Sequence, residues 1–363
     1  MATVGNYSGI PGSVFAEGGR AIQAWGRWVN QRGGIQGRPV RVLFLDDGSD
    51  PARHLRLVKD AVEREGAVAI VSEYASLTGQ ASVDYLTTKR IPVIGGAAAD
   101  AWFETNATYF PVMAVGQGYH FLTVAATVKT AQRAGLQRMG VIYCVEAAAC
   151  TAARDSWPKY ATQLGMEVVQ VTGASLAQPD FTAECLNFRN RGAEVVMILL
   201  DGNSVRRLAG SCARQGYRPL LMQPSDGFEQ AMLGDQNLNG LVGASGTYPI
   251  TLEGMARGSE ARAAIRTQMG DVDNFVIVGQ SWLAGEVLRA ALEAVPASAS
   301  SETVLEGLWR IKGDDFGGLT APLTYTRGAR SNQQPVCYFD LRINQGSFES
   351  PDGGTRHCVP FPG

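Results

Sequence analysis

The six cysteines are the residues of this 363-residue chain whose chemistry is easiest to infer from spacing. A zinc site needs ligands at short characteristic intervals, and none of these cysteines is spaced in that way. They fall instead into three successive pairs, which is typical of disulfides and of an oxidising compartment. Scattered buried thiols are the alternative interpretation. The pairs are Cys144 with Cys150, Cys185 with Cys212, and Cys337 with Cys358.

The three histidines do not suggest a catalytic centre, because His54, His120 and His357 lie far apart in the expected topology. The sequence holds no His-Glu-x-x-His, Gly-x-Ser-x-Gly or Walker A motif. The glycines of residues 32–37 (RGGIQG) follow an expected helix rather than a strand, so they do not predict a phosphate cradle. Oxidised cysteines would leave no thiol nucleophile. We therefore expect no enzyme, no cofactor and no metal site.

Composition excludes further classes of function. Hydrophobic residues make up 45% of the chain and charged residues 18%, which favours a folded core over disorder. The formal net charge of −2 does not fit a nucleic-acid-binding surface, which needs clustered basic residues. No apolar run approaches the roughly 18 residues of a membrane helix. No charged or apolar leader precedes the first expected strand, which indicates a cytosolic protein or an exported one whose signal peptide has been removed.

Short β-branched runs alternate with longer amphipathic stretches, and the alternation restarts after Tyr119. Strands that are apolar throughout and separated by helices indicate parallel sheets covered on both faces. Two such series predict an α/β protein with two doubly wound parallel-sheet lobes. The expected strands span 38–47, 67–72, 91–96, 138–144, 166–172, 193–201 and 219–225. The expected helices span 51–65, 76–89, 151–164, 180–191, 203–215 and, as a long buried helix, 274–295.

Several segments carry a family resemblance, and they occur in order along nearly the whole chain. They read VGNYSGIPGSVFAEGGRAIQAWGRWVNQRGGIQGRPVRVLFLDDGSDP, IPVIGGAA, PDFTAECLNFRNRGAEVVMIL and CARQGYRPLL. They resemble the branched-chain amino-acid-binding (Leu/Ile/Val-binding) proteins, the type I periplasmic solute-binding proteins of ABC importers. The resemblance implies the type I periplasmic binding fold, with a ligand cleft between two lobes and three hinge crossovers, near 118–121, 246–250 and 324–330. The N-terminal lobe would hold 1–119 and 249–325, and the C-terminal lobe 120–248 and 326–363.

The same resemblance implies a function in transport. The protein would bind a small amino acid or related carboxylate by hinge closure and deliver it to the membrane permease subunits of an ABC importer. It would be a monomer in the periplasm or outside the cell, with or without a lipid anchor, and would bind no nucleic acid. The alternative is a ligand-sensing regulator of the same fold, an amide or amino-acid sensor without a transport role. Disulfides would count against a cytosolic regulator.

The resemblance also places ligand contacts in the N-terminal lobe. Ser76 and Thr78 would hold a carboxylate through their hydroxyls and through N–H groups at a helix N-terminus, where the helix dipole attracts anions. Leu77 departs from the family pattern, which has serine there. Ser76 as a simple helix N-cap, and Phe15 as a core residue, are the alternatives. The further contacts expected in this lobe are the loop residue Ser8, the backbone at Ala97 and Ala98, and the apolar walls Tyr7, Phe15, Tyr74 and Tyr248. Tyr248, at the second crossover, would also close over the ligand.

The C-terminal lobe would contribute the loops that follow its strands. Asp226 or Asp201 would pair with a cationic group of the ligand. A desolvated ion pair of this kind needs further hydrogen bonds to be favourable. The alternative is that both aspartates cap helices. The loops also bring Glu146 and Asn203 to the expected site.

Overall fold

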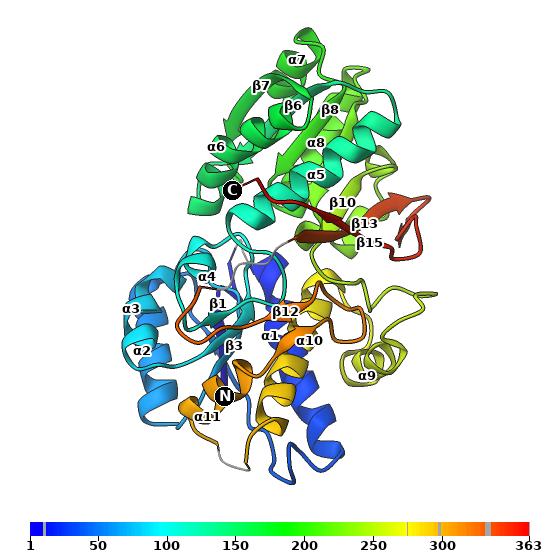
Figure 1. The fold of residues 1–363 in the computed structure, drawn as a ribbon. Helices are drawn as coiled ribbons and strands as arrows, with labels where there is room; N and C mark the ends of the chain where they lie inside the picture. Colours follow the sequence, from blue (N-terminus) through cyan, green and yellow to red (C-terminus); the bar gives the residue numbers. More distant parts are fainter. Residues whose placement is uncertain (10–11, 274, 297–298, 331–334, 363) are drawn as a thin grey trace. The chain divides into compact units, whose positions relative to one another are not determined.

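The computed structural model describes residues 1–9, 12–273, 275–296, 299–330 and 335–362 (Figure 1). The chain forms two compact units, each built from two separate segments. Unit 1 comprises Met1–Gly116 and Thr247–Gln334, and unit 2 comprises Gln117–Gly246 and Pro335–Gly363. Two of the boundaries lie beside the crossovers expected near 118–121 and 246–250. The third lies between Gln334 and Pro335, later than the expected 324–330.

Unit 1 contains a parallel sheet in the order β2-β1-β3-β4-β5. The order places β1 between β2 and β3, so the chain direction across the sheet reverses at β1, which is the topological switch point of a doubly wound fold. The strands are β1 (Ala2–Gly5), β2 (Leu43–Asp46), β3 (Ile70–Glu73), β4 (Val93–Gly96) and β5 (Tyr109–Phe110), with a separate antiparallel pair β11 (Lys312–Asp314) and β12 (Leu323–Thr324).

Helices cover both faces of this sheet. Helices α1 and α10 pack against each other on one face, and α2 and α3 lie on the other (Figure 1). Asp50 caps α2 as expected, accepting a hydrogen bond from the Arg53 N–H at 2.8 Å, and Pro51 opens the helix. The helices are α1 (Gly12–Gln31), α2 (Pro51–Glu63), η1 (Gly79–Ser82), α3 (Val83–Thr88), α4 (Ala101–Thr105), α9 (Ser259–Met269), α10 (Phe275–Glu293) and α11 (Ser301–Leu308).

Helix α10 corrects one expectation from the sequence. Its 19 residues are long and apolar enough, by length and composition alone, to cross a membrane, although no such run was expected. The most apolar window is 78% buried inside the protein, and the helix packs on α1, α11 and the strands β3 and β4. Burial on all sides explains the composition, because a helix surrounded by other elements is apolar around its whole circumference.

Unit 2 contains a sheet in the order β14-β13-β10-β9-β8-β6-β7, with β15 also paired to β13. Strands β6 to β10 are parallel to their neighbours among themselves, whereas β13 runs antiparallel to β10, β14 and β15. The strands are β6 (Arg138–Cys144), β7 (Glu167–Ala174), β8 (Val195–Leu199), β9 (Leu220–Pro224), β10 (Val242–Ser245), β13 (Val336–Asn344), β14 (Ser347–Glu349) and β15 (Arg356–Val359). The helices are α5 (Gln117–Arg133), α6 (Ala148–Gln163), α7 (Thr182–Asn190), α8 (Gly202–Arg214), η2 (Ser225–Gly227), η3 (Gln230–Met232) and η4 (Gln236–Leu238).

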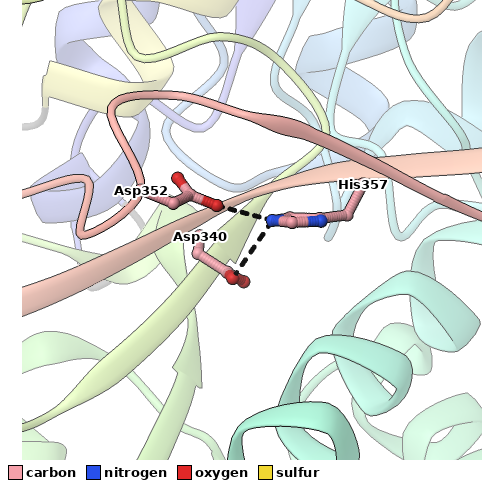
Figure 2. Close-up of side chains that lie close together, drawn as sticks. All are labelled: Asp340, Asp352 and His357. Atoms are coloured by element: carbon pink, nitrogen blue, oxygen red, sulfur yellow. Dashed lines mark hydrogen bonds and ion pairs between the residues drawn. The ribbon is translucent and has the colours of Figure 1, made fainter.

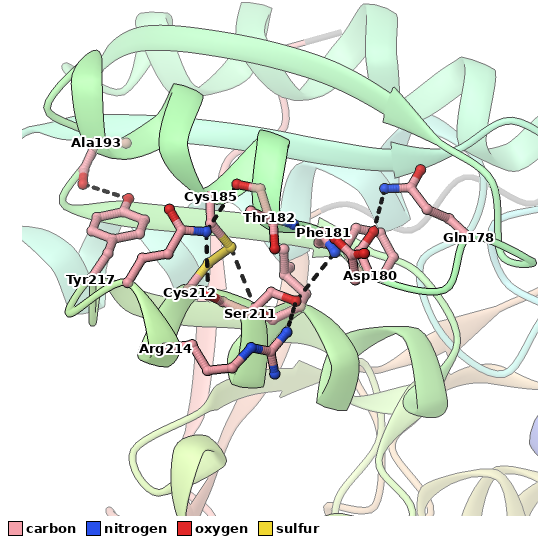
Figure 3. The surroundings of a disulfide bond; sticks show 12 residues. Gln178, Asp180, Phe181, Thr182, Cys185, Ala193, Ser211, Cys212, Arg214 and Tyr217 are labelled. Carbon is pink, nitrogen blue, oxygen red and sulfur yellow. Dashed lines mark hydrogen bonds between the residues drawn. A yellow bond between two sulfur atoms is a disulfide. The ribbon is translucent and has the colours of Figure 1, made fainter.

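All six cysteines form the disulfides predicted from the sequence, and all three bonds lie in unit 2. Cys144–Cys150 joins the end of β6 to α6. Cys185–Cys212 joins α7 to α8 (Figure 3). Cys337–Cys358 joins directly paired residues of β13 and β15. The alternative of scattered thiols is therefore wrong.

Candidate functional site

The candidate site in unit 1 is the edge where the parallel strands end, because ligands of open α/β sheets bind beyond the carboxyl ends of the strands. Three loops meet there: residues 6–9 after β1, 74–78 after β3 and 97–100 after β4. Backbone bonds link them, since the Asn6 N–H donates to the Tyr74 carbonyl at 2.8 Å and the Ala97 N–H donates to the Glu73 carbonyl at 3.0 Å.

The aromatic side chains expected to line the ligand are buried or half-buried within unit 1. Tyr7 and Tyr74 are 7% and 1% exposed, and they form an apolar cluster with Ala97 and Ile277. Phe15 is half-buried and stacks on Tyr74 at 5.4 Å between ring centroids. The ring of Tyr74 fits against α1 because Gly18 has no side chain there. The apolar character of these rings suits a core as well as a binding wall, so their contact with a solute stays a prediction.

The hydroxyls of these buried tyrosines are bonded within unit 1. The Tyr7 hydroxyl lies 2.5 Å from the Thr3 hydroxyl and donates to the Ser72 carbonyl at 3.1 Å. Tyr248 is also buried, at 2% exposure, and its hydroxyl accepts a hydrogen bond from the Arg257 N–H at 3.2 Å. Tyr248 is therefore packed within unit 1, and its contact with a solute stays a prediction.

Thr78 belongs to a buried polar network. Its hydroxyl donates to Asp47 Oδ2 at 2.6 Å and accepts from Asn6 Nδ2 at 2.8 Å. Asn6 Nδ2 also donates to Asp47 Oδ1 at 2.9 Å. Thr78 is 1% exposed, and the other two residues are fully buried. The Thr78 hydroxyl, which was expected to hold a ligand, thus joins the loops after β1, β2 and β3.

His54 completes this network from α2. Its Nδ1 lies 2.9 Å from Asp47 Oδ2 and its Nε2 lies 3.0 Å from the Ser82 hydroxyl. The order Asp47, His54, Ser82 is that of a serine-hydrolase triad, but all three side chains have no exposed surface for a substrate to reach. Burial opposes ionisation of Asp47, yet the hydrogen bonds from His54, Thr78 and Asn6 outweigh it and lower the pKa of this carboxyl.

Ser76 faces a carboxyl group. Its hydroxyl donates to Asp100 Oδ2 at 3.1 Å, and Asp100 is only 3% exposed. Burial raises the pKa of Asp100 to about 8, against the opposing hydrogen bond from Ser76. Burial also raises the pKa of Glu73 to about 8, and the charge of Asp100 acts in the same direction. Ser76 is not a helix cap, because η1 begins at Gly79 with Thr78 in the capping position.

The remaining expected contacts of unit 1 differ in exposure. Ser8 is exposed, and Leu77 is 38% exposed. Ala97 and Ala98 are buried, and the Ala98 carbonyl accepts a hydrogen bond from the Gly116 N–H at 2.8 Å. The outer surface of this edge is thus formed by Ser8, Ser76 and Leu77 among the residues predicted from the sequence.

In unit 2 the corresponding loops follow β6, β7, β8 and β9. Glu146 is exposed, and its carboxylate accepts hydrogen bonds from the Ser175 hydroxyl and the Leu176 N–H, both at 2.8 Å. It thereby joins the loop after β6 to the loop after β7. Val145 beside it is 58% exposed, a large apolar side chain at this edge.

The two aspartates predicted for a cationic group have different roles. Asp201 caps α8, because its carboxylate accepts from the Asn203 and Ser204 N–H groups at 3.0 and 3.2 Å. The capping alternative is therefore correct for Asp201. Asp226 lies in η2 with Pro224 as its cap, and its Oδ2 accepts the Tyr119 hydroxyl at 2.9 Å. Asn203 is exposed.

Other polar residues near these edges were not predicted. Gln223 at the end of β9 is 1% exposed, and its amide atoms have no hydrogen-bond partner in the described residues. Gly227 lies against this amide, and a Cβ there would lie 2.0 Å from Gln223 Nε2, so a larger residue would force the Gln223 side chain to move. The buried polar network of Asp47 and His54 was also missed. A histidine four residues into a helix that follows two aspartates was the only sequence signal for it.

A further cluster lies on β13 and the segment leading into β15, away from the strand ends (Figure 2). His357 Nε2 lies 2.5 Å from Asp352 Oδ2 and 3.6 Å from Asp340 Oδ2. These residue types could hold a metal ion. However, Lys129 Nζ lies 2.9 Å from the other ring nitrogen, Nδ1. An ammonium must donate there, so Nε2 carries the proton that it gives to Asp352. The cluster is therefore described as a hydrogen-bond network that holds β15.

Comparison with known proteins places the fold. A family model described as periplasmic binding protein matches residues 2–347. No curated protein sequence matches the chain. A branched-chain amino acid ABC transporter protein from Thermus thermophilus, solved with bound valine, is 19% identical with a TM-score of 0.83, covering 100% of this chain and 96% of that one.

Two further structures bind other solutes. A solute-binding protein of an ABC transporter from R. palustris, in complex with benzoate, is 17% identical with a TM-score of 0.80, covering 99% of this chain and 97% of that one. A fatty acid ABC transporter substrate-binding protein from Thermomonospora curvata is 16% identical with a TM-score of 0.79, covering 99% and 90%. These likenesses confirm the predicted type I periplasmic binding fold.

Proposed function

This chain belongs to the periplasmic binding protein family, and from that premise we propose that it captures a small amino acid or related carboxylate for an ABC importer. The observation that carries the proposal is the family match over residues 2–347. Solved structures of the same fold are described as binding valine and benzoate. The neighbours thus span amino acids and simple carboxylates, which sets the range of solutes to test.

Unit 1 and unit 2 are proposed as the two lobes, and the solute is proposed to contact the loops at their strand ends. Such loops suit binding, because the sheet fixes their backbone before the solute arrives and lowers the cost of association. The accessible groups there are Ser8, Ser76 and Leu77 in unit 1, and Asn203 and Asp226 in unit 2. We propose binding without catalysis, since the buried Asp47, His54 and Ser82 cannot reach a substrate.

The compartment follows from the family and from the cysteines. The family is extracytoplasmic, and three disulfides are typical of oxidising surroundings. The disulfides count against a cytosolic sensor of the same fold. We therefore propose a monomeric protein outside the cytoplasm, whose partners are the solute and the permease subunits of the importer.

The first test is a thermal-shift screen. The panel contains branched-chain and aromatic amino acids, benzoate, isovalerate, urea and short amides. A solute at 100 times its dissociation constant should stabilise the folded protein by about 2.7 kcal/mol. Titration calorimetry on the hits gives the affinity. If no member of the panel raises the melting temperature, a small polar solute is the wrong class.

Transport-type binding also predicts hinge closure. Solution scattering with and without a saturating hit should show a smaller radius of gyration in the bound protein. A hit that binds tightly but leaves the radius unchanged would indicate a rigid pocket and would argue against delivery to a permease.

A further inference from the structure

The disulfide Cys144–Cys150 spans a strand-end loop of unit 2. Cys144 is the last residue of β6, and Cys150 lies in the first turn of α6. The other two disulfides join α7 to α8 and β13 to β15. Cys144–Cys150 thus encloses the loop 145–147 and the start of the helix that follows it.

This bond is the least suited of the three to stabilise the fold as a whole. A disulfide stabilises mainly by restricting the unfolded chain, and its effect grows with the length of chain that it closes. The sequence separation is 6 for Cys144–Cys150, against 27 and 21 for the other two. A local role therefore fits this bond better than a global one.

Helix α6 needs a constraint at its first turn. Its capping residue is Ala147, which has no side-chain oxygen to accept the first N–H groups, whereas α2 and α8 are capped by Asp50 and Asp201. Pro158 also lies inside α6 and removes one hydrogen bond of the helix. The disulfide supplies the constraint that a cap would give, because it ties the first turn of α6 to the end of β6.

The enclosed loop presents an apolar and an acidic side chain to solvent. Val145 is 58% exposed, more than any other large hydrophobic side chain in the described residues. It packs beside Gly173 of β7, where a Cβ would lie 3.1 Å from Val145 Cγ1. The Glu146 carboxylate accepts hydrogen bonds from the Val145 N–H at 3.0 Å and from Ser175 and Leu176 at 2.8 Å. Glu146 therefore fixes the middle of the loop, and the disulfide fixes its ends.

We infer that Cys144–Cys150 is a positioning bond for solute binding, which holds Val145 as a preformed contact beyond the end of β6. The inference rests on the proposed function, in which the solute contacts the strand-end loops. Without the bond, the loop would have to be ordered when the solute binds, and that ordering weakens binding. The bond raises affinity by preorganisation and adds less to the stability of the fold than Cys185–Cys212 does.

Two double variants separate positioning from stabilisation in the full-length protein. Cys144→Ala combined with Cys150→Ala opens the strand-end bond. Cys185→Ala combined with Cys212→Ala opens the bond between α7 and α8 and is the control. Titration calorimetry with leucine, phenylalanine and benzoate measures affinity, and denaturant unfolding measures stability.

The strand-end variant should raise the dissociation constant about tenfold, because its loop must be ordered on binding. It should lose less stability than the control variant, whose affinity should stay near that of the wild type. Hydrogen exchange of residues 145–151 should rise in the strand-end variant and stay unchanged in the control. A strand-end variant with wild-type affinity, or with wild-type exchange in this loop, would overturn the inference and leave the proposed function standing.

A single substitution tests the same contact with the disulfide intact. Val145→Ala should weaken binding about fivefold, because apolar surface is lost from the contact. Leu186→Ala, at a side chain of α7 that is 41% exposed, is the matched control and should bind as wild type does. Unchanged affinity in Val145→Ala would overturn the inference, because the loop would then contact no solute. If the wild-type protein bound none of the three probes, the proposed function would fail, and the inference with it.

Discussion

Units 1 and 2 fix the loops at their strand ends by different means. In unit 1 the loops after β1, β2 and β3 are joined by the buried hydrogen bonds of Asn6, Asp47 and Thr78. In unit 2 a disulfide, Cys144–Cys150, starts at the last residue of β6, and one exposed carboxylate, Glu146, joins the loops after β6 and β7. Neither segment of unit 1 contains a cysteine.

This difference means that the stability of unit 1 should respond to pH and the stability of unit 2 to reductants. A buried polar network stabilises a fold only while every member is paired, and it responds to protonation because its strength comes from charged partners. A disulfide acts mainly by restricting the unfolded chain and responds to reductants. The two units can therefore be perturbed separately, and hydrogen exchange followed by mass spectrometry resolves which unit opens.

The largest effect should come from Asp47→Ala. The substitution leaves His54 and Asn6 buried without their common acceptor, and each buried polar group left without a partner costs about 1–3 kcal/mol. Denaturant unfolding should show this loss, with faster exchange in unit 1. Asp60→Ala, at a partly exposed ion pair of α2, is the control and should cost less than about 1 kcal/mol. Equal losses in the two variants would show that the buried network contributes no more to stability than a partly exposed ion pair does.

The matching experiment in unit 2 removes the disulfide between α7 and α8. Replacing Cys185 and Cys212 together by alanine opens a link across 27 residues, which should cost about 3 kcal/mol. Exchange should rise in 182–214 and stay unchanged in unit 1. Spread of the effect into unit 1 would mean that the two units unfold as one.

The third effect is a pH dependence of unit 1. Asp100 and Glu73 have pKa values raised to about 8, so the stability they contribute is complete below the pKa of the unfolded chain, near 4, and is lost as pH rises through 8. Unit 1 should lose about 1.4 kcal/mol per pH unit for each carboxyl in this range, or on the order of 2 kcal/mol between pH 5 and pH 6.5. Asp100→Asn should flatten the curve. The lowered pKa of Asp47 acts oppositely, with stability lost only as pH falls below about 4.

The sequence predicted the fold well because periodicity and caps are local. Asp50 and the alternating strands needed no knowledge of distant residues, and the disulfide pairs followed from consecutive elements. The single helix expected over 76–89 was wrong at its start, since residues 74–78 form a loop before η1. The site was harder. Thr78 and Tyr74 have the residue types of ligand contacts. Their hydrogen bonds to Asp47 and to the Ile277 carbonyl of α10 come from tertiary structure, which no local pattern reveals.

The smallest expected change in stability distinguishes a helix-capping role from a binding role for the two aspartates of unit 2. Asp201→Ala removes the acceptor of two N–H groups at the start of α8 and should cost about 1 kcal/mol, the usual loss for a helix cap. Because the carboxylate is engaged in the cap, the affinity for any solute found in the thermal-shift screen should fall little.

Asp226→Asn in contrast should leave stability nearly unchanged, since its amide oxygen can still accept from Tyr119. It should weaken binding of a solute that carries an ammonium group. Calorimetry and denaturant unfolding on the same two proteins decide the matter. If Asp201→Ala lost affinity more than Asp226→Asn did, the cationic end of the solute would lie at α8, and the cap would have a second role in binding.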